Sequence, residues 1–195
     1  RRALDVFGDD DAPKGHFEIF FDDVIVPVST STVLGKGCGF EVAQARLGPG
    51  RIHHCMRAVG MAERALSMMI SRAQRRITFG KKLSSQGVVQ QRIALSRVEI
   101  DQARLLVLHC AKMMDKELHK KKKSYELIQL MSMIKSTVPS MACNVIDRSI
   151  QVFGAKGLCQ DTVLARFFTG VRSLRIADGP DEVHLELIAR IEIKK

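Results

Sequence analysis

The sequence predicts a mainly α-helical protein: an up-down helical bundle with a short β segment at its N-terminus. Near the N-terminus apolar and polar residues alternate, as in a strand, whereas from Ile52 onward apolar residues recur about every 3.6 positions, as on one face of a helix. Several helical stretches follow one another, separated by glycine-rich or charged turns, and helices joined in this way pack as a bundle. We therefore expect a β segment and connecting loop over residues 1–45 and a helical-bundle domain over residues 46–195.

The composition limits the classes of function. The 195 residues are 46% hydrophobic, enough for one sizeable core, and their apolar runs fall far short of the roughly 20 residues that a membrane span needs. The formal net charge of +10 could favour nucleic acid, an anionic membrane or phosphorylated small molecules. With one tyrosine, no tryptophan and no recognised nucleic-acid motif, we expect no nucleic acid, and nothing specific supports membrane association.

The cysteine and histidine patterns argue against a disulfide framework and against a metal site. The five cysteines are odd in number, widely spaced and contain no C-x-x-C pair, which favours a reducing compartment. The adjacent residues His53 and His54 would point about 100° apart on a helix, and no third ligand follows at a useful offset. We therefore expect no metal and ordinary helical roles for both histidines.

The N-terminal segment is interpreted as two strands and a glycine-rich connection. Residues 16–21 alternate, Asp22 and Asp23 form a turn, and the residues up to Val26 are apolar. Two strands alone are barely stable in water, so this pair should belong to a larger sheet. The glycines of residues 34–40 could suggest a phosphate-binding loop, but the glycine spacing and the strand-to-helix context of such a loop are missing, so a flexible connection is expected.

Two long amphipathic helices are expected next. The first begins at about Ile52, after a start signal at residues 48–50, and ends near Thr78. The second can be capped by Ser84 and is apolar on two faces. One face carries Val89, Ile93, Ile100, Ala103, Val107 and Met114, and the other carries Leu95, Val98, Leu105 and Leu108. Because both faces are apolar, this helix should lie in the middle of the bundle.

Three further helices complete the predicted bundle. A solvated turn at the basic run of residues 119–123 separates the second helix from the third, which carries an apolar stripe over residues 127–153. Pro139 lies inside that stripe and should kink the helix or leave a local defect. A fourth helix is expected over residues 162–176 and a fifth over residues 181–193.

Three short segments carry residue types suited to chemistry. Arg76-x-x-Phe79-Gly80 could present a planar cation to a phosphate beside an apolar ring, although on spacing alone a surface arginine and a core phenylalanine are the commoner outcome. Gln151-x-x-Gly154-x-x-Gly157 could let the backbone approach a ligand, and a glycine helix cap explains Gly154 just as well. The acidic turn at residues 177–184 places three carboxylates on a rigid Gly-Pro turn in a basic chain.

Taken together, in this order and at these separations, the three segments resemble the C-terminal half of the acyl-CoA dehydrogenase family. Residues 17–27 and 34–40 resemble the last strands of that family's middle β-domain and the connection leaving it, so residues 1–45 would be the end of that domain and residues 46–195 its C-terminal helical domain. Residues 47–54 and 177–184 look most similar to the subgroup called acyl-CoA dehydrogenase family members ten and eleven.

The resemblance implies an FAD-dependent oxidoreductase that introduces an α,β double bond into a fatty acyl-CoA thioester. It implies FAD-binding roles for Arg76 and Phe79, for Gln151, Val152, Phe153, Gly154 and Ala155, and for Pro180, Asp181 and Glu182. It implies contacts with acyl-CoA for Gly48, Pro49, Gly50, Arg51 and Gly179. Ala155 stands where the family has a second glycine, and its methyl group is tolerable if only the backbone N–H is used.

The resemblance also implies that Asp178 is the catalytic base. Most family members carry glutamate at this position, and the place where some members put the base instead is Gly50 here, which cannot act. Aspartate is shorter than glutamate by one C–C bond, about 1.5 Å, so the turn should lie closer to the substrate or a different acyl chain should be accommodated. Asp178 would remove the proton next to the thioester carbonyl while hydride leaves the adjacent carbon for the flavin.

The resemblance further implies partners and a location. In that family the two ADP-contacting segments reach the FAD of a neighbouring subunit, which implies a homodimer or homotetramer with FAD at the subunit interface, and electron-transfer flavoprotein as the acceptor. A mitochondrial location is expected, with a peroxisomal one as the alternative, although Lys194-Lys195 is not a peroxisomal tripeptide. Because the chain has about half the family's usual length, we expect this polypeptide alone to be inactive and to bind FAD weakly or not at all.

Two other classes of protein fit parts of the pattern. A helical oligomerisation or interaction module without catalysis would show the same stripes and would be indifferent to mutation of Arg76, Gln151 and Asp178. A basic nucleic-acid or membrane module would bind through Lys120 to Lys123, with an affinity that falls steeply as salt rises. Neither class explains why the three segments occur together.

Overall fold

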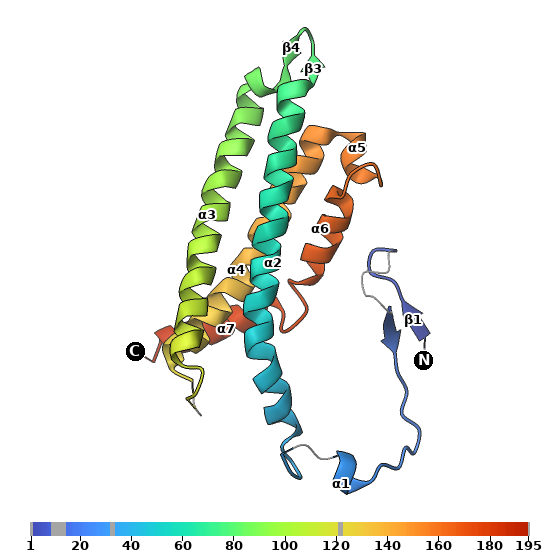
Figure 1. The fold of residues 1–195 in the computed structure, drawn as a ribbon, viewed down its shortest axis with the longest axis vertical. Coiled ribbons are helices and arrows are strands. Elements are labelled where there is room, and N and C mark those ends of the chain that lie inside the picture. Colours follow the sequence, from blue (N-terminus) through green and yellow to red (C-terminus); the bar gives the residue numbers. More distant parts are fainter. Residues whose placement is uncertain (1, 9–14, 32–33, 121–122, 195) are drawn as a thin grey trace. The chain divides into compact units, whose positions relative to one another are not determined.

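The computed structural model describes residues 2–8, 15–31, 34–120 and 123–194. The chain divides into two compact units, residues 1–50 and residues 51–195, and the long helix α2 (Gly39–Arg75) contributes residues to both. Helices make up most of the described chain (Figure 1), so the mainly α-helical fold predicted from the apolar period is confirmed. The assignment of residues 1–45 and 46–195 to two family domains stays a prediction.

The first unit contains a short antiparallel ladder. Strand β1 (Arg2–Leu4) pairs with β2 (His16–Glu18), and the side chains of Arg2 and Glu18, which lie opposite each other, form an ion pair of 2.9 Å. The predicted pairing of residues 16–21 with the residues after Asp23 is wrong, because residues 19–27 form no strand. The strand partner of β2 is instead β1, which lies before it in the sequence and is joined to it by the Arg2–Glu18 charge pair. The alternation of apolar residues does not reveal this pairing.

Large apolar side chains follow this ladder and face solvent within the described chain. Phe21 is 81% exposed and Ile25 is 96% exposed. An apolar run of this kind requires a covering surface. The larger sheet expected for this segment stays a prediction.

Helices begin earlier than the sequence pattern indicated. After α1 (Val28–Ser31), α2 begins at Gly39 rather than near Ile52, so residues 48–50, interpreted as a start signal, lie inside the helix. Residues 40–47 are mostly good helix formers, and their propensity outweighs the loss of one backbone donor at Pro49.

The second unit is the predicted helical bundle. After α2 come β3 (Ile77–Thr78), β4 (Lys81–Lys82), the 3₁₀ helix η1 (Leu83–Ser85), α3 (Gly87–Lys116), α4 (Tyr125–Phe153), α5 (Ala155–Leu158), α6 (Leu164–Ser173) and α7 (Asp181–Glu192). Helix α4 contacts α3, α5, α6 and α7, and the Ser149 hydroxyl on α4 donates to the Ala65 carbonyl of α2 at 2.6 Å. Helix α4 is therefore the central helix of this unit (Figure 1).

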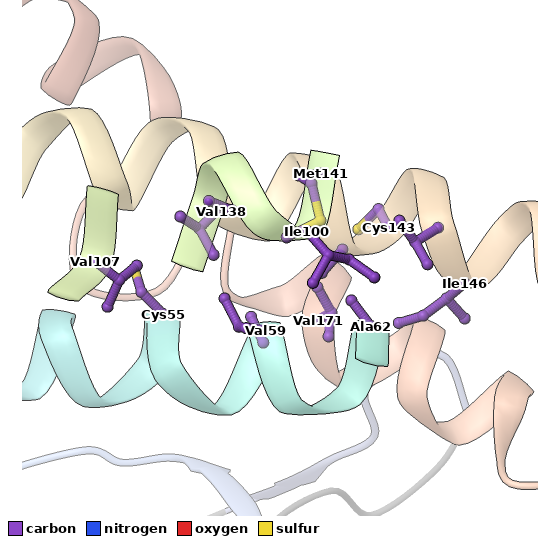
Figure 2. Close-up of a cluster of buried hydrophobic side chains, with 14 of the residues drawn as sticks. Cys55, Val59, Ala62, Ile100, Val107, Val138, Met141, Cys143, Ile146 and Val171 are labelled. Carbon is purple, nitrogen blue, oxygen red and sulfur yellow. The ribbon is translucent and has the colours of Figure 1, made fainter. Parts of the chain in front are cut away.

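Side chains from four helices meet in one hydrophobic core (Figure 2). The figure shows Cys55, Val59 and Ala62 of α2, Ile100 and Val107 of α3, Val138, Met141, Cys143 and Ile146 of α4, and Val171 of α6. The stripes predicted on the first and third helices, and the first of the two stripes predicted on the second helix, thereby contribute to the core. Each fully buried aliphatic side chain contributes about 1.5–3 kcal/mol relative to exposure, so the stripes account for most of the driving force for packing.

The second helix, α3, does not lie in the middle of the bundle. Its first apolar face packs into the core, but the four residues of its second face are between 45% and 69% exposed. They are Leu95, Val98, Leu105 and Leu108. The prediction of two buried faces is wrong for the described chain, because only the first of the two stripes packs against other helices of the bundle.

The cap predicted for α3 is also wrong. Ser84 lies inside η1, and the N-cap residue of α3 is Gln86, whose side chain makes no capping hydrogen bond. The carbonyl of Ser84 instead accepts from the Gln90 side chain at 3.0 Å. Helix α3 is fixed to α2 by a cluster of partly exposed ion pairs in which Glu63 accepts from Arg97 and Arg104.

The later helices follow the predicted bounds closely. Helix α4 runs through Pro139 as one element, and the Ser124 hydroxyl caps it by accepting from the backbone N–H of Leu127 at 3.2 Å. Helices α6 and α7 differ from the predicted ranges by only a few residues. The basic run lies between α3 and α4, as predicted, with Lys121 and Lys122 outside the described residues.

In the part of the chain that the structure describes, no helix combines the length and the apolarity needed to cross a membrane. The same residues contain no group of three or more His, Cys, Asp or Glu side chains that could hold a metal ion. All five cysteines are free thiols.

Candidate functional site

The acidic turn joins α6 to α7 and has an unusual backbone. Asp178 has a φ of +59° and Gly179 a φ of +104°, and Pro180 is the N-cap residue of α7. A positive φ is ordinary for glycine, but for aspartate it must be maintained by surrounding contacts. A Cβ on Gly179 would lie 2.9 Å from Nε2 of His184, so glycine is required for this close approach.

Three side chains bind the backbone of this turn. Nε of Arg51 donates to the Asp178 carbonyl at 3.0 Å, and Nε2 of His184 lies 3.3 Å from the same oxygen. Nζ of Lys135 donates to the Gly179 carbonyl at 3.1 Å. Because these donors come from α2, α7 and α4, the turn is fixed to three helices.

Lys135 is fully buried, and no carboxylate of the described residues lies within ion-pair distance of its ammonium group. Its second acceptor is the carbonyl of Leu174, the C-cap residue of α6, at 2.5 Å, so the ammonium group connects the end of α6 to the turn. Burial lowers the pKa of Lys135, and the nearby charges of Cys55, Asp181 and Asp178 oppose that shift. A buried cation of this kind needs hydrogen-bond partners, and the two carbonyls satisfy two of its three N–H donors.

His184 connects the turn to α4. Because the Asp178 carbonyl can only accept, Nε2 of His184 carries the proton, and Nδ1 can then accept from the Ser132 hydroxyl at 3.4 Å. Burial lowers the pKa of His184, and the positive charges of Arg51 and Lys135 lower it further. His184 is therefore neutral at physiological pH and acts as a directional donor to the turn.

One oxygen of the Asp178 carboxylate lies at ion-pair distance from a histidine. Its Oδ2 lies 3.2 Å from Nε2 of His54 on α2, and the two side chains are 22% and 25% exposed. Burial lowers the pKa of His54, while the Asp178 charge raises it. Oδ1 of Asp178 accepts no hydrogen bond from the described residues. A carboxylate with one oxygen beside a histidine and the other without a partner in the described chain can act as a general base.

The two other carboxylates of the turn have different surroundings. Asp181 is 7% exposed, and its Oδ2 accepts from Nε of Arg175 at 2.7 Å. Glu182 is exposed in the first turn of α7, where a carboxylate is favourable at the positive end of the helix dipole. Pro180 is half-buried. Asp181 thus stabilises the turn, and the FAD contacts expected of all three residues stay predictions.

The first predicted FAD segment forms an exposed hairpin. Phe79 and Gly80 connect β3 to β4 with φ values of +50° and +76°, the two positive values of a type I′ turn. Phenylalanine is uncommon in that conformation, and its side chain is fully exposed, as is typical of a contact with a ligand or another chain. Arg76 is exposed at the start of the hairpin.

The second predicted FAD segment borders a cavity. Helix α4 ends at Phe153, which is followed by Gly154 with a φ of +67°. Phe153 lines an open cavity of about 420 Å³, and the guanidinium of Arg72 lies over its ring, 5.6 Å from the centroid. The cavity is further lined by Ser67, Met68, Ser71 and Arg75. In the same segment Gln151 and Ala155 are exposed and Val152 is buried.

The predicted site residues form two separate groups. Arg51, Asp178 and Gly179 meet at the turn, whereas the FAD segments lie at the C-terminal end of α2 and beside it. Between Arg51 and Arg75 the helix α2 is about 36 Å long, at about 1.5 Å per residue. Residues 48–50 belong to the first unit, and their substrate contacts stay predictions.

Three residues of the site were missed in the sequence. His54 was interpreted as an ordinary helix residue, although it lies three positions after Arg51 and therefore shares its helix face. Lys135 lies inside the apolar stripe of α4, and a charged residue at a core position is a signal that could have been used. His184 sits one helical turn after Pro180, which places it back against the acidic turn.

Comparison with known proteins identifies the family. Residues 37–192 match the family described as acyl-CoA dehydrogenase, C-terminal domain. Relatives include acyl-CoA dehydrogenase family members 10 and 11; member 10 of Mus musculus is 54% identical over 193 residues, which are 99% of this chain and 18% of that protein. Two solved structures extend the comparison to the fold.

A candidate acyl-CoA dehydrogenase of Mycobacterium abscessus has a TM-score of 0.91 and 44% identity, covering 100% of this chain and 46% of that chain. A structure of the electron transferring flavoprotein of Acidaminococcus fermentans matches with a TM-score of 0.74 and 27% identity, covering 83% of this chain and 40% of that chain. The chain thus spans less than half the length of these proteins. It belongs to the acyl-CoA dehydrogenase family.

Proposed function

We propose that the protein is an FAD-dependent acyl-CoA dehydrogenase in which Asp178 is the catalytic base. Family membership supports the reaction class, an oxidation of an acyl-CoA thioester. The observation that carries the assignment of the base is the Asp178 carboxylate itself, which sits on a fixed turn with Oδ2 at ion-pair distance, 3.2 Å, from Nε2 of His54 and Oδ1 without a partner in the described chain. A base needs such a free and positioned oxygen.

The residues of the cavity beside Phe153 fit the ADP part of FAD. Nε of Arg72 is buried without a hydrogen-bond partner among the described residues, and Arg75 lines the same cavity. Guanidinium groups beside an aromatic ring suit a pyrophosphate and an adenine. Arg76, Phe79 and the segment 151–155 would hold this part, with residues 180–182 toward the flavin. When bound, FAD supplies the hydride acceptor for the oxidation.

Asp178 would take the proton from the carbon next to the thioester carbonyl onto its free oxygen. That proton is only weakly acidic, so negative charge developing on the substrate must be stabilised in the transition state. The positive charges of Arg51 and Lys135 lie at the same turn and favour this charge. Gly179 and Arg51 would contact the acyl-CoA, because both adjoin the base.

The partners proposed are acyl-CoA as substrate and electron-transfer flavoprotein as acceptor. We further propose a homodimer or homotetramer with FAD at the subunit interface, which the 36 Å separation along α2 supports, because the two groups of site residues would then serve different FAD molecules. A mitochondrial location, with a peroxisomal one as the alternative, completes the proposal.

A helical oligomerisation module without catalysis is the second candidate. The exposed apolar face of α3, formed by Leu95, Val98, Leu105 and Leu108, favours it, because such a face is typical of a contact with another chain. This function predicts that replacing Arg76, Gln151 or Asp178 changes nothing measurable. The catalytic proposal predicts loss of FAD or of turnover in each case.

The test is an assay of the intact FAD-loaded protein over a series of acyl-CoA chain lengths, with reduction of an artificial electron acceptor as the readout. At least one chain length should support turnover, and free CoA should not. The absence of acyl-CoA-dependent reduction at every length would contradict the proposal. The 195-residue chain alone is expected to bind FAD weakly or not at all, and stoichiometric flavin absorbance in it would contradict that expectation.

A further inference from the structure

The carboxylate of Asp178 is attached to α2 by a single side chain, His54. Nε2 of His54 lies 3.2 Å from Oδ2 of Asp178. Among the described residues, no other basic side chain lies within ion-pair distance of this carboxylate. The contacts of Arg51, Lys135 and His184 go to backbone carbonyls and therefore fix the turn without fixing the rotation of the carboxylate. The orientation of the two carboxylate oxygens thus depends on His54.

The tautomer of His54 follows from its surroundings. Nε2 lies 3.2 Å from a carboxylate oxygen, which only accepts, so the form with the hydrogen on Nε2 is favoured over one that faces two lone pairs toward each other. Nδ1 is buried and has no partner among the described residues. A proton on Nδ1 would therefore be a buried donor without an acceptor, which disfavours the imidazolium form. His54 is neutral, with its hydrogen on Nε2.

This geometry also excludes His54 as the base. Its Nε2 is engaged with Asp178, and its Nδ1 is shielded from solvent even in this chain alone. The atom left to accept a proton is Oδ1 of Asp178, on the side of the carboxylate away from His54.

We propose that His54 is the positioning residue of the reaction: its Nε2–H holds Oδ2 of Asp178 so that Oδ1 faces the substrate and takes the α-proton. This inference rests on the proposed function of Asp178 as base. In the proton-transfer step the Cα–H bond breaks, an O–H bond forms at Oδ1, and the electron pair stays on the acyl group, whose two-electron oxidation is the role of the flavin. Displacing a catalytic group by about 1 Å can lower the rate by on the order of 10²-fold, so the placement of the Asp178 carboxylate matters.

The bridge should also respond to pH. Besides Asp178 from the turn, His54 faces Lys135 from α4 and the charges of Arg57 and His53 on its own helix. When His54 becomes protonated at acid pH, a positive charge beside Oδ2 makes the transfer of a proton to Oδ1 less favourable. Turnover should fall in the acid range for this reason.

Two substitutions of His54 separate positioning from general structural damage. In glutamine the side-chain nitrogen is three bonds from Cβ, as Nε2 is in histidine, so His54→Gln can place an N–H donor beside Oδ2 without a titratable ring. In asparagine the nitrogen is only two bonds from Cβ, so His54→Asn cannot reach Asp178. The matched control is His53→Gln, because His53 is exposed on the same helix and has no contact with Asp178 among the described residues.

The experiment measures kcat, KM and their pH dependence in the intact FAD-loaded protein. We expect His54→Asn to lower kcat by about 10- to 100-fold with little change in KM, His54→Gln to retain kcat within about 5-fold, and His53→Gln to match the parent. The acid limb of kcat should move to lower pH in His54→Gln. Wild-type kcat and an unchanged acid limb in His54→Asn would overturn the inference.

A second readout is independent of activity. In the intact protein labelled with ¹⁵N-histidine, the His54 signal, identified by its loss in His54→Gln, should show the Nε2–H tautomer and should change in Asp178→Asn. A His54 signal with the hydrogen on Nδ1 would overturn the positioning role. Failure of the proposed function would be recognised separately: Asp178→Asn would keep full turnover, whatever the effect of the His54 variants.

Discussion

The buried ammonium group of Lys135 donates to the carbonyl of Gly179 at 3.1 Å and so binds the central helix of the bundle to the turn that carries Asp178. The same group donates to the carbonyl of Leu174, the C-cap residue of α6. A cation that is buried without a carboxylate in the described chain is uncommon, and here it fixes backbone rather than forming an ion pair. The position of the proposed base therefore depends on a residue that makes no contact with its carboxylate.

Replacing Lys135 with methionine tests this dependence. The apolar side chain removes a buried charge but leaves two carbonyls without their donor, so we expect the free energy of unfolding to change by no more than about 1 kcal/mol. The turn loses its attachment, so kcat of the intact enzyme should fall by about 10-fold or more. Urea unfolding and steady-state kinetics measure the two effects, with Lys112→Met on the exposed side of α3 as the control. Unchanged kcat would show that the turn is held without Lys135.

Gly179→Ala should disturb the turn directly. The added methyl group would lie 2.9 Å from Nε2 of His184 at a φ of +104°, so we expect a loss of about 1–3 kcal/mol in the free energy of unfolding. Gly170→Ala is the matched control, because Gly170 lies inside α6 and its added Cβ would meet no atom within 4 Å. That control should be neutral or should stabilise by up to about 1 kcal/mol. Equal effects of the two substitutions would contradict the close approach of His184.

Stability should decrease as the pH falls below about 6.5. Burial lowers the pKa of His54 and of His184 from their usual value of 6.5, so between the lowered values and 6.5 the unfolded chain binds more protons than the folded one. The free energy of unfolding therefore rises with pH through this window. The pKa of Glu63 is lowered from 4.5 by hydrogen bonds from Arg97, so its contribution is lost only in more acid solution. Denaturant unfolding at a series of pH values checks this. A flat profile from pH 6.5 downward to pH 5 would contradict it, and His184→Gln should reduce the slope.

The five thiols should differ in reactivity. Burial raises the pKa of Cys55 to about 12 and that of Cys110 to about 11, and burial also raises the pKa of Cys143. The thiolate is the reactive form, so these three should resist alkylation in the native protein, while the partly exposed Cys38 and Cys159 react. Iodoacetamide labelling near neutral pH, followed by mass spectrometry, measures each site. Modification of Cys55 as fast as Cys159 without unfolding would contradict the packed core.

The helical part of the fold could be predicted from the sequence because burial imposes a period. The stripes of α2 and α4 place residues such as Val59 and Ile134 in the core, where the pattern predicted them. Helix starts were harder, because a Gly-Pro-Gly sequence indicates a break and yet lies inside α2. An apolar stripe also does not reveal whether another helix covers it. The second apolar face of α3 is therefore predicted to be buried, although no element of the described chain covers it.

The site could be predicted only in part for a similar reason. Asp178 and Gly179 follow from the residue types of one turn, which are adjacent in sequence. His54 and Lys135 come from helices far away in the chain, 124 and 43 positions before Asp178, and only folding brings them to the turn. A single sequence carries no signal for such contacts apart from a polar residue at a helix position that should be apolar.

The most direct test of the account is Asp178→Asn in the intact FAD-loaded protein, with Glu186→Gln on the exposed side of α7 as the control. Asparagine keeps the size and the contact with His54 but cannot accept the α-proton, so bound flavin should be retained while acyl-CoA-dependent turnover falls by about 10²- to 10⁴-fold. The control should keep both. Retained flavin together with undiminished turnover in Asp178→Asn would contradict the assignment of the base.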